Sequence, residues 1–194
     1  MNIENKIHTT NVEGLSKNSP KYLIIHANKS YPDFADLLML HKYKNGWEGI
    51  GYHLFVSNSN RIYQARPFDK RGAHAKGFNS RSIALSFYKE NNDIDEMKVH
   101  LGKYVIKHIQ EKYPEIEIIP HTLAQTEHIN KLLRMNKIDK KFPETIELVN
   151  EKLSQEIKKD MFEFSETLPN NYKFLKIRLR NFNNCPGEIF HYFV

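Results

Sequence analysis

Residues 51–87, GYHLFVSNSNRIYQARPFDKRGAHAKGFNSRSIALSF, carry the clearest fold signal in the chain. Two apolar segments flank SNSN at 57–60, a composition typical of tight turns, so this part is predicted to form a β-hairpin. The run RSIALSFY at 81–88 is apolar and short, which predicts a further strand. The stretch therefore predicts a β-sheet that contains a hairpin and the strand that follows it.

The segments on either side extend this sheet. KYLIIH at 21–26 is an apolar run typical of a buried strand, and EIEIIPH at 115–121 is a similar short run. A helix is expected from Asp33 to a stop at Gly46, and helical spacing of apolar residues predicts an amphipathic helix over 95–112. The order strand, helix, hairpin, strand, helix, strand indicates a mixed α/β fold, with a central mixed sheet flanked by helices.

The two ends of this core differ from it. Residues 1–20 lack periodicity and are interpreted as an N-terminal arm, which leaves 21–194 as one domain. Residues 122–180 are rich in Lys, Glu and Asn, and we interpret them as a mostly helical inserted subdomain. Within it, apolar spacing from Ile146 predicts a helix with Pro143 in its first turn. The alternating segment NNYKFLKIRLRNF at 170–182 predicts a strand.

Composition narrows the classes of protein. The 194 residues carry a net charge of +6, which fits any polyanion, but no nucleic-acid-binding motif is present and no nucleic-acid partner is expected. No apolar stretch is long enough to span a bilayer, and the polar N-terminus has no signal-peptide pattern. A single cysteine excludes an internal disulfide and fits a reducing compartment.

Three residues stand out as candidate metal ligands. His26 and His121 come at the ends of predicted strands, and Cys185 comes just before Pro186 in NNCPGEIF. Two imidazoles and a thiolate form a suitable first shell for a catalytic Zn²⁺, which leaves one position open for water. Spacing alone leaves open the alternative that these are scattered structural residues, because no HExxH or CxxC pattern links them.

Several separate segments together resemble one family. GYHLF, RIYQARP, GAHAKGFNSRSI, the upstream IIHANKS and the terminal CPGEIF are similar, in order and spacing, to the type 2 N-acetylmuramoyl-L-alanine amidases. That family includes T7 lysozyme-like amidases and peptidoglycan recognition proteins. The resemblance implies a mixed sheet with flanking helices, a zinc ion in a groove, and hydrolysis of the bond between N-acetylmuramic acid and L-alanine in peptidoglycan.

Carried over by position, the resemblance assigns His26, His121 and Cys185 as the zinc ligands and Tyr52 as the tyrosine that positions water or stabilises the oxyanion. His53 would point to the opposite face of its strand and have a packing role. His128 is the alternative to His121 as second histidine ligand.

The loop GAHAKGFN at 72–79 would form one wall of the groove. His74, Lys76 and Asn79 are therefore candidate contacts to the sugar or to the peptide stem, and the ammonium group of Lys76 suits carboxylates. The alternative for each is a role in the loop itself.

Two features depart from the family pattern. Only a short segment usually separates the second histidine from the cysteine, whereas here the separation is 64 positions, so the insertion lies beside the zinc site and is a candidate surface for a protein partner. Relatives often carry Lys or Thr two residues before the cysteine, whereas this chain has Asn183, whose amide can donate a hydrogen bond but carries no charge. The alternatives are weaker catalysis than in lysine-bearing relatives, or a helper from another segment, such as Lys173 or Lys176.

The prediction is a zinc-dependent amidase, of phage-endolysin type or a secreted antibacterial effector, that reaches the cell wall after release. The alternatives are a recognition domain that binds muropeptides without cleaving them and a cytoplasmic wall-recycling amidase. Retention of Cys185 favours an enzyme, whereas Asn183 leaves the recognition domain open.

Overall fold

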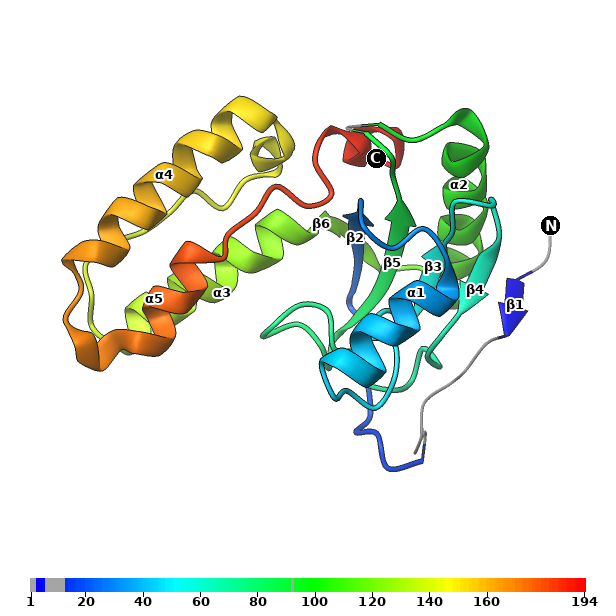
Figure 1. The fold of residues 1–194 in the computed structure, drawn as a ribbon, viewed down its shortest axis with the longest axis horizontal. Helices are drawn as coiled ribbons and strands as arrows, with labels where there is room; N and C mark the ends of the chain where they lie inside the picture. The colour runs from blue at the N-terminus through cyan, green and yellow to red at the C-terminus, as the bar shows by residue number, and fades with distance from the viewer. Residues whose placement is uncertain (1–2, 6–12, 92) are drawn as a thin grey trace.

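The protein is built around a six-stranded mixed sheet. The computed structural model describes residues 3–5, 13–91 and 93–194 (Figure 1). The strand order is β1-β4-β3-β5-β2-β6, and β3 and β4 form the one antiparallel pair in this sheet. The strands are β1 (Ile3–Asn5), β2 (Tyr22–Asn28), β3 (Leu54–Val56), β4 (Ile62–Gln64), β5 (Ser82–Tyr88) and β6 (Glu117–Pro120). The predicted fold class, the hairpin and the strands predicted at 21–26, 81–88 and 115–121 are confirmed.

Alternation along the strands divides the core between the two faces of the sheet. Leu23 and Ile25 of β2 lie in the core cluster that also contains residues of helix α2 (Glu96–Lys112). Ile24 packs on the opposite face with Phe78 and Ala124. His26 has the same parity as Ile24, so the alternation directs its side chain to the face that carries the 72–80 loop.

Strand β5 leaves room for polar groups on this face. Its residues Ser82, Ala84 and Ser86 are fully buried, and Ser86 pairs in register with His26. These small side chains alternate with large apolar ones that point into the other core. The small side chains on this face of β5 therefore leave space for the neighbouring histidine rings.

The two predicted helices of the core are present. The first consists of α1 (Phe34–Leu38), which continues as a short π-helical segment, Met39–Lys44. Gly46 follows at φ +67°, a left-handed conformation that suits glycine as a stop. α2 is capped by Asp95, whose carboxylate accepts a hydrogen bond of 2.8 Å from the Lys98 amide.

Three helices form a group beside the sheet (Figure 1, left): α3 (His121–Met135), α4 (Glu151–Thr167) and α5 (Lys173–Arg180). Three short 3-10 segments, Ile146–Val149, Asn170–Tyr172 and Glu188–Tyr192, complete the elements of this C-terminal half. The helices enclose a core of their own, which contains no strand residue: Ile129, Leu133, Phe142, Met161, Leu168, Leu175, Leu179 and Phe182.

Two predictions within this helical group are wrong. The helix expected behind Pro143 begins only at Glu151, where the Asn150 side chain caps it by accepting the Leu153 amide at 3.1 Å. The strand predicted at 170–182 is mainly α5. Its buried residues Leu175 and Leu179 are four apart, so the helix faces one apolar stripe towards the helical core.

Two boundaries near the ends of the sheet also differ from the predictions. The N-terminal arm contains β1, which pairs in parallel with β4 at the sheet edge, so residues 3–5 are not loop. The last strand ends at Pro120, and His121 is the first residue of α3 rather than the end of a strand. Within the described ranges, no helix has the length and apolar character of a membrane span.

Candidate metal centre

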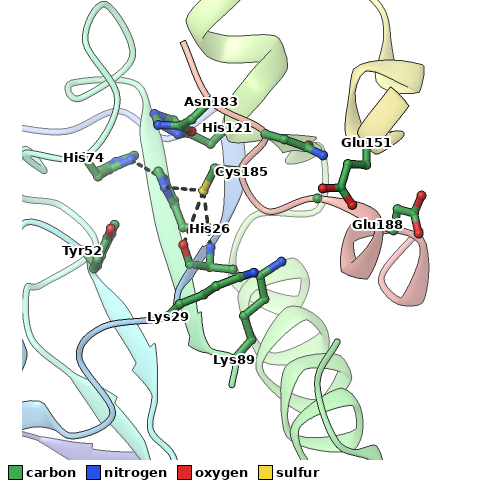
Figure 2. Close-up of a pocket in the computed structure, with 13 residues that line it drawn as sticks. His26, Lys29, Tyr52, His74, Lys89, His121, Glu151, Asn183, Cys185 and Glu188 are labelled. Carbon is green, nitrogen blue, oxygen red and sulfur yellow. Dashed lines mark hydrogen bonds between the residues drawn. The ribbon is translucent and has the colours of Figure 1, made fainter. Parts of the chain in front are cut away.

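Three residues from distant segments converge at the carboxyl-terminal ends of β2 and β6 (Figure 2). His26 lies in β2, His121 opens α3, and Cys185 lies in the loop between α5 and the last 3-10 turn. One side-chain nitrogen or sulfur of each lies within 4.8 Å of the others. The structure thus brings together the three residues predicted as ligands, although no short sequence motif links them.

A chain of hydrogen bonds fixes the orientation of the His26 ring. The Ser82 hydroxyl donates to the Phe78 carbonyl at 2.8 Å, so its oxygen is free to accept from Nε2 of His74 at 3.3 Å. Nδ1 of neutral His74 is then an acceptor, and it lies 3.1 Å from Nε2 of His26. His26 must donate through Nε2, so its Nδ1 is left unprotonated, facing Sγ of Cys185 at 3.9 Å.

Backbone contacts hold Cys185 in place. Its sulfur accepts from the Ala27 amide at 3.4 Å, and its carbonyl accepts from the Thr122 amide, the second residue of α3, at 2.8 Å. The buried Lys89 ammonium group donates to the next carbonyl, that of Pro186, at 3.0 Å. The cysteine is therefore tied to β2, α3 and the end of β5 at once.

The protonation states suit metal ligation. Burial, and after it electrostatic repulsion from His121 and His74, holds the pKa of His26 well below its usual range. Burial lowers the pKa of His121 to about 4. Both rings are neutral at pH 7 and offer lone pairs. Burial raises the pKa of the Cys185 thiol to about 11, so a cation would have to displace its proton on binding.

The donor set fits zinc. Nδ1 of His121 is buried and has no hydrogen-bond partner, which is costly unless something else uses its lone pair. Two imidazoles and one thiolate are ligands that Zn²⁺ accepts in sites with three protein ligands and one open position. The hydrogen bond from His26 to His74 is the kind of outer contact that orients such a ligand.

Tyr52 and His53 lie on opposite sides of the chain just before β3. The Tyr52 ring centroid is 5.0 Å from that of His26, and Tyr52 lines the cavity in front of the ligands. His53 is fully buried, with Nε2 donating to the Lys70 carbonyl at 2.8 Å and Nδ1 accepting from the Ala84 amide at 3.1 Å. The packing role predicted for His53 is confirmed.

The cavity in front of the ligands has a volume of about 380 Å³ and mixed charge. Lys29 and Lys89 line one part of it, and Glu151 and Glu188 lie across from them (Figure 2). Glu151 is the first residue of α4, so the helical group contributes directly to this cavity. Sequence reasoning missed these four residues; the one available signal was that Lys29 and Lys89 directly follow strands.

Asn183 also lines this cavity, near His121 (Figure 2). It is exposed, and its backbone amide donates to Oε1 of Gln125 at 3.3 Å. Lys173 and Lys176, considered from the sequence as replacements for a helper at this position, are on α5 and do not line the cavity.

The three residues of the 72–79 loop that were predicted to contact substrate have different surroundings in the structure. The Asn79 side-chain oxygen accepts the backbone amides of His74 and Ala75, at 2.9 and 2.8 Å, so Asn79 supports the loop, and its contact with substrate stays a prediction. His74 lines the cavity but also orients His26. Lys76 is exposed and lines a neighbouring cavity together with His128, which is not part of the three-residue cluster.

The fold and the His–His–Cys cluster define an α/β protein with a candidate metal centre at the edge of its sheet. The sequence pattern of one family, Amidase_2, N-acetylmuramoyl-L-alanine amidase, matches residues 16–140. The chain belongs to this family, as the resemblance predicted.

Known proteins of two kinds are similar to this chain. The structure of the N-acetylmuramoyl-L-alanine amidase LysC from Clostridium intestinale URNW superposes with a TM-score of 0.58 at 21% identity, covering 72% of this chain and 99% of that one. For Drosophila PGRP-LB the TM-score is 0.54 at 19% identity, covering 63% and 84%. These likenesses establish the fold. More than a quarter of this chain has no counterpart in LysC.

Peptidoglycan-recognition protein SC2 of Drosophila melanogaster is 38% identical over 47 residues, 24% of this chain and 26% of that protein. The chain thus spans about a quarter of this relative's length.

Proposed function

We propose that this chain is a zinc-dependent N-acetylmuramoyl-L-alanine amidase, which hydrolyses the amide bond between N-acetylmuramic acid and L-alanine in peptidoglycan. Membership of the amidase family supports the reaction class. The observation that carries the proposal is the convergence of His26, His121 and Cys185, whose ligand atoms lie within 4.8 Å of one another. These three residues would hold the zinc ion.

Zinc bound there would supply Lewis acidity and lower the pKa of a water molecule. The residues around it would orient the reacting groups. Burial, then the nearby Cys185, raises the pKa of Tyr52, so its hydroxyl stays protonated and can donate a hydrogen bond to the carbonyl oxygen as negative charge develops. Asn183 lies at the mouth of the cavity, where its uncharged amide would donate a second hydrogen bond.

Charged side chains compensate for the lack of a lysine at position 183. Lys89 is held by the Pro186 carbonyl and lines the cavity, as does Lys29. Their positive charge would stabilise the anionic transition state, and burial of Lys89 would strengthen its contribution. Glu151 and Glu188 balance this charge and would restrict which substrates enter.

We further propose that residues 122–180 are a subdomain inserted into a domain of residues 21–194. Its separate apolar core supports this division, and its position beside the cavity supports a role in substrate or partner choice. The biological setting we favour is cell-wall cleavage after release, as a phage-type endolysin or a secreted antibacterial effector. A cytoplasmic wall-recycling amidase is the alternative setting for the same chemistry.

A binding-only function is the second candidate, because a relative at 38% identity is a recognition protein and Asn183 lacks the charge of the usual helper. Digestion of purified peptidoglycan separates the two. Zinc-loaded protein should release new L-alanine amino termini, and a chelator should stop the release. Binding of muropeptides by fully zinc-loaded protein without any release would establish the recognition function instead.

A further inference from the structure

A second cavity adjoins the candidate metal centre. It has a volume of about 160 Å³, and His74 and His121 line both cavities. One wall comes from Lys76 of the 72–79 loop, and the other from His128 on α3 and Arg178 on α5. The cavity therefore exists only because the helical group packs against the 72–79 loop.

This cavity is positively charged. No acidic residue lines it in the part of the chain that the structure describes, whereas Glu151 and Glu188 line the first cavity. The pKa of His128 is lowered by burial and then by the charges of Arg178 and Lys76, so the three basic groups lie close enough to repel one another. An anion bound between these groups would be stabilised by their positive charges.

Several polar atoms of these basic groups have no hydrogen-bond partner among the described residues. Both ring nitrogens of His128 and Nε of Arg178 are buried without a hydrogen bond. Among the described residues, neither Lys76 nor Arg178 makes an ion pair, although Arg178 lies over the Phe174 ring at 5.0 Å. Other basic residues of the helical group do make such pairs: Arg134 with Glu144, Lys140 with Asp160 and Arg180 with Glu166.

The backbone makes space for the His128 ring. Gly77 has φ +88°, and a Cβ atom at this position would lie 2.8 Å from Nδ1 of His128. Gln125 and Asn181 add neutral polar groups to the lining. The cavity thus offers several donors within a volume that holds about five water molecules, which suits a small planar anion.

We propose that this cavity binds a free carboxylate of the peptide stem, next to the bond that is cleaved. The inference rests on the proposed function, because His121, a proposed zinc ligand, also borders this cavity. The carboxylate must belong to a residue close to the scissile amide. In the stem this is the residue after L-alanine, a glutamate whose α-carboxyl group is free in some walls and amidated in others.

The test compares two synthetic substrates, N-acetylmuramoyl-L-alanyl-D-glutamate with a free α-carboxyl group and the same compound with an α-carboxamide. For zinc-loaded protein, kcat/KM should be about tenfold or more higher for the free acid, because charge-assisted hydrogen bonds are lost with the amide. In Arg178→Gln and in Lys76→Gln this ratio should fall towards one. Arg134→Gln, which removes a paired and exposed charge of the same helical group, should leave the ratio unchanged.

Equal kcat/KM values for both substrates in the unmodified protein would overturn the proposal, and so would an unchanged ratio in folded Arg178→Gln and Lys76→Gln. Calorimetric binding of both compounds distinguishes this failure from failure of the proposed function. Tighter binding of the acid without any hydrolysis would support the carboxylate site and refute the amidase. Hydrolysis of both compounds at one rate would do the reverse.

Discussion

The hydrogen bond between His26 and His74 should control metal affinity, which His74→Phe tests. Phenylalanine keeps the ring but removes the acceptor that lies 3.1 Å from Nε2 of His26. Nε2 would then be a buried donor without a partner, at a cost of about 1–3 kcal/mol. Loss of an outer contact of this kind usually reduces metal affinity about 10–100-fold, which corresponds to roughly the same free energy.

The assay is competition for zinc against a chromogenic chelator, at pH 7, with folding checked by circular dichroism. His74→Asn is the matched control, because its side-chain oxygen can occupy the acceptor position of Nδ1 and should restore most of the affinity. The orientation argument is refuted when folded His74→Phe binds zinc as tightly as the unmodified protein, or when His74→Asn is as weak as His74→Phe.

Three further predictions concern stability and the cysteine loop. Burial lowers the pKa of His53 to about 4, so the stability that its neutral ring contributes is complete above pH 6.5 and is lost as the pH falls towards 4. Over this pH range, urea titrations should show that the free energy of unfolding falls by about 3 kcal/mol less in His53→Gln than in the unmodified protein. Equal declines in the two proteins would contradict this. Lys89→Met removes the donor to the Pro186 carbonyl and should weaken zinc binding several-fold in chelator competition, whereas Lys98→Met, at another buried lysine, should only destabilise the fold. Gly102→Ala would place a Cβ 2.5 Å from an aromatic ring and should lower stability by about 1–3 kcal/mol in thermal unfolding, despite alanine's better helix propensity; an unchanged or higher melting temperature would show that the core relaxes.

The sheet could be predicted from the sequence because its strands follow simple patterns. The alternation of small and large residues in Ser82–Tyr88 corresponds to two different packing environments, and the asparagine-rich turn of the hairpin includes Asn60 at φ +57°. The local sequence pattern and the tertiary environment agree in these segments, so the sequence alone is sufficient to predict their strands.

The helical group was harder because its patterns are ambiguous. Residues 170–182 fit both a two-residue and a helical period, and only packing against the core of this group selects the helix. Helix α3 was missed because its buried face is partly polar. Asn130, for example, is buried and exchanges hydrogen bonds with both backbone groups of Phe142, at 2.8 and 2.9 Å.

The candidate site likewise combines residues that could be predicted from the sequence with residues that could not. The three ligand candidates came from a family resemblance over separate motifs, and the structure brings them together. The contributions of Lys89 and Glu151 depend on how segments distant in sequence meet at the cavity, which no local pattern encodes. The support that Asn79 gives to its loop likewise depends on a turn whose geometry the sequence does not specify.

The most direct test of the central claim is the absorption spectrum of the protein reconstituted with Co²⁺ in place of zinc. A thiolate ligand produces an intense ligand-to-metal charge-transfer band, so the unmodified protein should show this band at one equivalent of cobalt. We predict that the band is absent in Cys185→Ser and unchanged in His128→Ala, while His26→Ala and His121→Ala lose tight binding. Persistence of the band in Cys185→Ser, or its loss in His128→Ala, would contradict the assignment of His26, His121 and Cys185 as the metal ligands.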